Sequence, residues 1–109
     1  MQCGGDTTGR AGDGWSFRLL DGSNLLACTA KLTIIDLQTG AKLRSESFSQ
    51  AQLESGQARG TLEAQRIYRI DFLRTPTNVP FTVELTVGGR TFSDPCPGGP
   101  TLPWTIFVS

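Results

Sequence analysis

The sequence contains no histidine, and it has only three cysteines, one tyrosine and one methionine among 109 residues. Histidine is the usual general base near neutral pH, so neither a Ser-His-Asp nor a Cys-His catalytic arrangement can be built from this chain. Three dispersed cysteines without a Cys-x-x-Cys pair do not supply the four ligands of a zinc site. We therefore predict no catalytic residue, no metal site and no cofactor.

Carboxylates are the groups that remain for acid–base chemistry. Asp21, Asp36, Asp71 and Glu84 fall at the ends or at the outward positions of expected strands, and nothing in their spacing forces two of them together. Glycoside hydrolysis, for example, needs two carboxylates about 5–9 Å apart. We expect these residues to form a solvated surface and the protein not to be an enzyme.

Long apolar runs and an excess of one charge are also missing. The ten Lys and Arg residues balance ten Asp and Glu residues, and the basic residues are scattered. This balance argues against nucleic acid or an anionic membrane surface as a partner. No segment approaches the roughly 20 apolar residues of a membrane helix. We expect one soluble domain.

The sequence does contain a series of segments in which apolar and polar residues alternate. The clearest is Phe81–Val87, where every second side chain is apolar, the pattern of a half-buried β-strand. Ser49 and Gly56 are placed to begin and end a short helical turn. The fold class predicted for residues 15–109 is all-β, a single antiparallel β-sandwich of about seven to eight strands. The other expected strands cover residues 15–21, 28–36, 41–48, 58–63, 65–73, 90–93 and 103–109.

The alternation also predicts which side chains form the core. One face of Phe81–Val87 is expected to meet the inward faces of two other strands between the two sheets. The predicted core residues are Phe81, Val83, Leu85, Val87, Leu32, Ile34, Tyr68, Ile70 and Phe72.

Two of the cysteines lie at the ends of expected elements. Cys28 opens a strand, and Cys96 lies in a turn-rich segment. A Cys28–Cys96 disulfide would close a loop of about 70 residues, worth about 4 kcal/mol in the loop-closure model, and small extracytoplasmic domains commonly use such a bond. The alternative is two unpaired, buried thiols. We predict the disulfide, and with it an extracytoplasmic location: periplasmic, outer-membrane-anchored or secreted.

The first fourteen residues have a different composition from the rest of the chain. Cys3 is followed by a polar, glycine-rich stretch that resembles the start of a mature bacterial lipoprotein, in which a lipidated cysteine precedes a flexible tether. Cys3 is therefore the candidate for lipidation, and a lipid there is the only membrane attachment we expect. The alternative is a disordered tail with an incidental cysteine. In either case residues 1–14 are predicted to be flexible.

Three stretches resemble the transthyretin-like and carboxypeptidase-regulatory-like β-sandwiches. Residues 17–43 contain a strand, a glycine-containing turn and a hairpin around Gln38-Thr39-Gly40, residues 62–72 resemble the family's Gly-x-Tyr-x-Ile strand without its glycine, and residues 102–109 are similar to its closing strand. An immunoglobulin-like sandwich could produce much the same pattern. The family's best-known enzymes hydrolyse hydroxyisourate with histidines, an arginine and a C-terminal Tyr-Arg-Gly-Ser motif. The histidines and that motif are missing here, so the resemblance implies the fold without this activity.

Large aromatic residues are the remaining recognition groups. Trp15 and Trp104 are candidates for exposed platforms, because Trp104 lies beside prolines where a loop meets a strand. The last segment places Trp104, Ile106 and Val108 on one face and Phe107 on the other. Such a strand is either central in the monomer or covered by another chain.

We therefore expect a non-catalytic extracytoplasmic module that mediates protein–protein contact or self-association, as a lipoprotein or as a subunit of an assembly. The interaction candidates are Trp104, Ile106, Phe107 and Trp15. The alternative is a carbohydrate-binding module that uses exposed aromatic residues.

Overall fold

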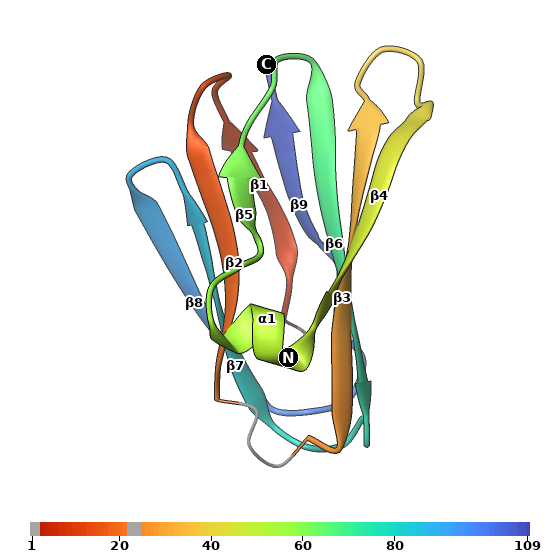
Figure 1. The fold of residues 1–109 in the computed structure, drawn as a ribbon, viewed down its shortest axis with the longest axis vertical. Helices are drawn as coiled ribbons and strands as arrows, with labels where there is room; N and C mark the ends of the chain where they lie inside the picture. The colour runs from red at the N-terminus through yellow and green to blue at the C-terminus, as the bar shows by residue number, and fades with distance from the viewer. Residues whose placement is uncertain (1–2, 22–24) are drawn as a thin grey trace.

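The computed structural model describes residues 3–21 and 25–109. In this part of the chain, nine strands form two packed sheets, and one short helix connects a strand of one sheet to a strand of the other (Figure 1). The five-stranded sheet has the order β1-β9-β6-β3-β4, and the four-stranded sheet has the order β5-β2-β7-β8. The elements are β1 (Gly5–Gly9), β2 (Gly14–Asp21), β3 (Ala27–Asp36), β4 (Lys42–Ser49), α1 (Gln50–Glu54), β5 (Arg59–Thr61), β6 (Arg66–Thr75), β7 (Phe81–Val87), β8 (Arg90–Cys96) and β9 (Trp104–Val108).

The all-β sandwich predicted from the alternation is confirmed. Every strand pairing is antiparallel except that of β1 with β9. The side chains of β7 alternate strictly between buried and half-buried, as their sequence pattern requires. The predicted helical turn is α1, which Ser49 caps in a capping box with Gln52. Gly56 follows with a φ of +78°, a conformation that favours glycine, and the chain then enters β5.

The core lies between the sheets and contains the predicted residues. All four apolar residues of β7 are at most 3 % exposed, and they face the buried side chains of β3 and β6. Ile34 is only partly buried and packs against this cluster. The alternation in the sequence thus identified the correct face of each of these strands.

The flexible tether predicted for residues 1–14 is wrong over Gly5–Gly9. These residues form β1, which pairs in parallel with β9 from Gly5 opposite Trp104 to Gly9 opposite Val108. Strand pairing uses backbone groups, so a polar, glycine-rich segment can join a sheet without an alternating pattern. Gly9 packs so closely that a Cβ atom there would lie 2.5 Å from Cδ1 of Leu62.

The predicted Cys28–Cys96 disulfide is also wrong, because Cys96 is bonded to Cys3 with a Cα–Cα distance of 5.6 Å. Cys3 leads into β1 and Cys96 ends β8, and these two edge strands lie on the same side of the sandwich. Cys28 lies on β3, next to the opposite edge strand, and is a buried free thiol. The Cys3 sulfur that was expected to carry a lipid is therefore occupied. The bond is compatible with an oxidising, extracytoplasmic environment.

Candidate functional site

Both tryptophans that were expected to form exposed platforms are buried. Trp15 is 5 % exposed and Trp104 is 2 % exposed. The indole Nε1 of Trp104 donates a hydrogen bond to Oδ2 of Asp94 at 2.7 Å, and its ring packs edge-to-face on Phe17 with centroids 5.1 Å apart. Ile106 is completely buried in the core. These three residues hold the two sheets together and offer no surface to a sugar or a partner.

Phe107 is the one predicted interaction residue that faces outward. It is half-buried on the outer face of the five-stranded sheet, where it lies beside Ile67 of β6. Ile67 in turn lies beside Ile35 of β3, so the three side chains form a short apolar stripe across three strands. Strand β9 has β1 on one edge and β6 on the other. Its two apolar faces are thus explained by an inner position in the sheet, with only the outer face uncovered.

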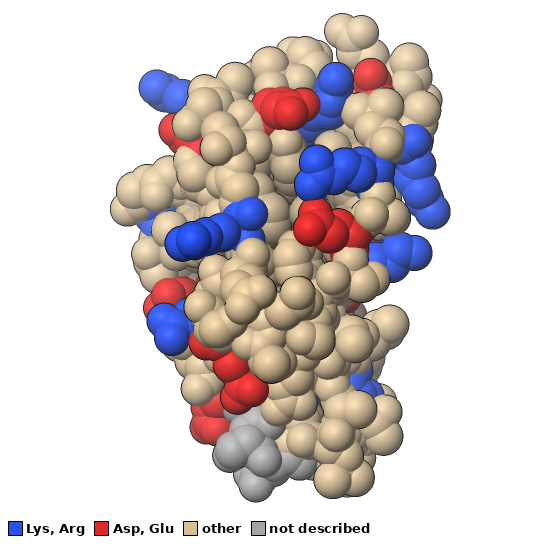
Figure 2. Space-filling view, viewed as in Figure 1, with Lys and Arg blue, Asp and Glu red and all other residues tan. Residues whose placement is uncertain are grey.

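The acidic residues are used locally. Among the described residues, ion pairs join Arg44 to Glu46, Arg66 to Asp36 and Arg69 to Asp71, and no three metal-ligating side chains come together. The pKa of Asp36 is lowered because its carboxylate accepts hydrogen bonds from the backbone N–H groups of Thr39 and Gln38. This is a turn-forming role. Figure 2 shows basic and acidic side chains interspersed on one face of the molecule.

The most open part of the sheet is the second half of β6. Pairing of β6 with β9 stops where Ile70 lies opposite Trp104, whereas pairing of β6 with β3 continues to Thr75 opposite Ala27. Residues 71–75 therefore have a strand neighbour on one side only. On the other side lies the segment that connects β8 to β9.

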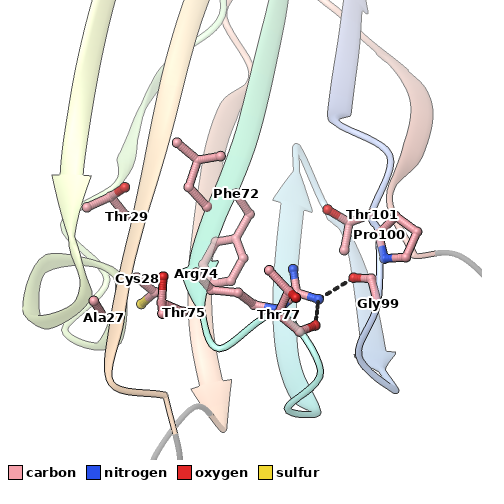
Figure 3. Close-up of a pocket in the computed structure, with 11 residues that line it drawn as sticks. Ala27, Cys28, Thr29, Phe72, Arg74, Thr75, Thr77, Gly99, Pro100 and Thr101 are labelled. Atoms are coloured by element: carbon pink, nitrogen blue, oxygen red, sulfur yellow. Dashed lines mark hydrogen bonds between the residues drawn. The ribbon is translucent and has the colours of Figure 1, made fainter.

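A pocket of about 730 Å³ lies at this place (Figure 3). We call it the β6 pocket; it is lined by residues 27–29, 72–75, 77 and 99–101. Its volume is in the range of ordinary ligand sites in proteins. Its walls combine apolar side chains with four threonines and one charged residue, Arg74, and they include no acidic residue.

Arg74 is buried at the wall of the β6 pocket, with 9 % of the residue exposed. Its Nη2 donates hydrogen bonds to the backbone carbonyls of Thr77, at 2.8 Å, and of Gly99. The guanidinium carbon lies 4.6 Å from the ring centroid of Phe81. Its Nε is buried and has no hydrogen-bond partner among the described residues. Burial lowers the pKa of Arg74, because the protein solvates the charged form less well than water does.

Sequence reasoning missed Arg74, although the sequence contains a signal for it. The inward-facing residues of β6 are Tyr68, Ile70 and Phe72, and the next position with the same parity is Arg74. A charged residue at an inward position of a strand is unusual, because burying a charge is costly. Charge at an inward position could therefore have indicated the site.

Comparison of the chain with protein-family models, with curated proteins and with solved structures finds no match in any of the three. The structure has, within residues 3–21 and 25–109, no helix with the length and apolarity that crossing a membrane requires.

Proposed function

We propose that this protein is a non-catalytic binding module that mediates protein–protein contact by holding an extended segment of a partner protein in the β6 pocket. The observation that carries the proposal is the one-sided stretch of β6, residues 71–75, beside a pocket of about 730 Å³. A strand with free backbone groups on one side is a template for pairing with an extended peptide.

The outer edges of the two sheets are less suited to such pairing. Strand β4 carries Lys42, Arg44 and Glu46, and charged side chains on an edge discourage strand addition. Strand β5 has three residues, and β8 contains Pro95, which has no N–H group to donate. On β1, the carbonyl of Thr8 already accepts a hydrogen bond from Arg90. The stretch at residues 71–75 contains no proline and is longer than β5. Its two charged residues are Asp71, which pairs with Arg69, and Arg74, which is buried.

The location we propose is extracytoplasmic, either secreted, periplasmic or attached to an assembly at the cell surface. The support is the Cys3–Cys96 disulfide, since such bonds persist mainly in oxidising compartments. We also propose a fold-level relation to the transthyretin-like sandwiches, supported by the order of the strand segments from β2 onward. The absence of histidine argues against hydroxyisourate hydrolysis for this chain.

The test is selection from a phage-displayed library of linear peptides whose C-termini are free, followed by hydrogen exchange on the complex. A selected peptide should slow amide exchange within residues 71–75. The variant Thr29→Trp places a large ring in the pocket from an exposed position on β3 and should weaken binding about tenfold or more, a loss of about 1.4 kcal/mol. The control Phe107→Glu changes the apolar stripe far along the same sheet and should bind as the wild type does.

Three outcomes contradict the proposal. Protection confined to β4 would place the contact at the outer edge of the sheet. Loss of binding in Phe107→Glu alone would place it on the apolar stripe. Concentration-dependent self-association in analytical ultracentrifugation, with protection of residues 71–75 by the chain itself, would make the occupant a second copy.

A further inference from the structure

The β6 pocket contains a buried positive charge that pairs with no acidic side chain of residues 3–21 and 25–109. Arg74 takes part in none of the ion pairs found among the described residues. The residues outside the described ranges are Met1, Gln2, Gly22, Ser23 and Asn24, none of which carries a carboxylate side chain. Buried charges in proteins are normally paired, because their removal from water costs several kcal/mol. Two carbonyl dipoles and the face of Phe81 compensate only part of that cost.

The guanidinium also has donors to spare. A guanidinium has five N–H groups, and both hydrogen bonds of Arg74 to backbone carbonyls start from Nη2. The N–H groups on Nε and Nη1 lie outside these two bonds, and buried Nε has no acceptor among the described residues. The planar fork of arginine matches the two oxygens of a carboxylate, and hydrogen bonds between charged groups are the stronger ones.

The other walls of the β6 pocket agree with an anionic, elongated occupant. Thr29, Thr75, Thr77 and Thr101 place hydroxyl-bearing side chains around the pocket, and no lining residue is acidic. Figure 3 shows the guanidinium of Arg74 between the end of β6 and Gly99. A segment lying along residues 71–75 would thus pass this charge. The chain has a formal net charge of zero, so any preference for an anion must come from a local group such as this one.

We infer that the β6 pocket recognises a carboxylate, carried by the extended segment of the partner and held by Arg74. This inference rests on the proposed function and adds the chemistry of the partner to it. The same group could also come from a free organic acid, so the experiment uses both sources.

The direct readout is the Nε–Hε signal of Arg74 in the NMR spectrum of the full chain. The probes are acetate, chloride at the same ionic strength, and the selected peptide synthesised with either a C-terminal carboxylate or a C-terminal amide. The acid peptide and acetate should shift the Arg74 signal, whereas chloride and the amide peptide should not. The acid peptide should bind about tenfold or more tightly than its amide, as expected for charge-assisted hydrogen bonds.

Substitution of Leu73 changes the charge of the pocket next to Arg74 and leaves Arg74 itself in place. Leu73 lines the β6 pocket and is 63 % exposed, so its variants should fold. Leu73→Glu should weaken binding of the acid peptide several-fold and Leu73→Lys should strengthen it, with Leu73→Gln between them. Binding of the amide peptide should change little across this series. Arg74→Gln should abolish the preference for the acid, and Arg69→Gln on the outer face of the same strand should keep it.

The two proposals fail in different ways. If acid and amide peptides bind equally and both protect residues 71–75, the carboxylate inference is wrong and the binding module remains. If acetate shifts the Arg74 signal but no selected peptide does, the pocket binds a free organic acid, and the carboxylate does not come from a peptide. If neither acetate nor the acid peptide moves that signal, the carboxylate site is overturned. Retention of the acid preference in folded Arg74→Gln would also overturn it.

Discussion

Replacing Cys3 with serine should remove a large share of the stability of this domain. The disulfide joins residues that are 93 positions apart, and the loop-closure model assigns a bond over that separation about 4.6 kcal/mol. Removing a native disulfide from a small domain typically lowers its free energy of unfolding by about 2–5 kcal/mol, and the free energy of unfolding of a whole domain is about 5–15 kcal/mol. With a urea m-value of about 1–3 kcal/mol/M, the unfolding midpoint should fall by roughly 1.5–4.6 M.

The assay is urea unfolding followed by circular dichroism, with three variants. Cys3→Ser and Cys96→Ser remove the same bond, so each should lower the midpoint equally, and the double variant should be no less stable than either. Cys28→Ser removes a buried free thiol and should cost much less. Thiol counting on unfolded, unreduced wild type should find one reactive thiol, that of Cys28.

Three reactive thiols in the unreduced protein would refute the bond itself. A loss of stability in Cys28→Ser as large as that in Cys3→Ser would refute the pairing, because Cys28 would then be one of the two bonded cysteines. A midpoint unchanged in Cys96→Ser would refute the magnitude, since the loop-closure model could not then describe this chain.

Two further changes test the assigned core and the buried thiol. Val83→Asp should place an unpaired charge at a fully buried position of β7 and unfold the domain. Thr82→Lys, opposite Asp21 on β2, should change the urea midpoint little. Equal effects of the two substitutions would contradict the assigned register. Burial, with a smaller contribution from the charge of Glu54, raises the pKa of the Cys28 thiol from its usual value near 9 to about 11. The unfolded chain therefore loses this proton first as pH rises from about 9 to 11, so stability should fall in that range more for the wild type than for Cys28→Ser. If the urea midpoints of these two proteins changed equally with pH between pH 8 and 11, the thiol would not be buried in this way.

The strands with alternating sequences could be predicted because one side of each is buried in the core. In β3, β6 and β7 the period of two identifies both the strand and its inward face, as at Leu32, Ile70 and Val83. The same logic explains the missed strand β1, in which pairing with β9 through backbone atoms leaves little pattern in Gly5–Gly9.

The site could be predicted less well because it depends on where neighbouring strands stop. Alternation would place Arg74 inward once the expected strand is extended beyond residue 73, but it does not show that β9 begins too late to cover residues 71–75. The cysteine pairing failed for a related reason. Sequence spacing does not show which sheet edges meet, and the glycine-rich composition after Cys3 favours a tether rather than a strand that would bring Cys3 to Cys96.

The opening beside β6 has its own origin in the sequence, in the segment between β8 and β9. Pro97, Pro100 and Pro103 interrupt this segment, and a proline has no N–H group with which to continue a ladder beside β6. Its backbone bonds go elsewhere. The N–H of Gly99 donates to the carbonyl of Thr77, beyond the end of β6, the N–H of Leu102 donates to the carbonyl of Cys3, and the carbonyl of Pro103 accepts from the N–H of Gly5.

The Cys3–Cys96 bond strengthens the same arrangement, because Cys96 precedes this segment and Cys3 is hydrogen-bonded to its far end. The far end of the segment is thus held against the N-terminal residues, and no backbone hydrogen bond found among the described residues joins the segment to residues 71–75 of β6. Arg74 bridges β6 and this segment through its bond to the carbonyl of Gly99. The disulfide, the prolines and the late start of β9 therefore act together to keep one stretch of an inner strand unpaired. In a domain that protects its outer edges, this stretch is where an added strand meets the least resistance.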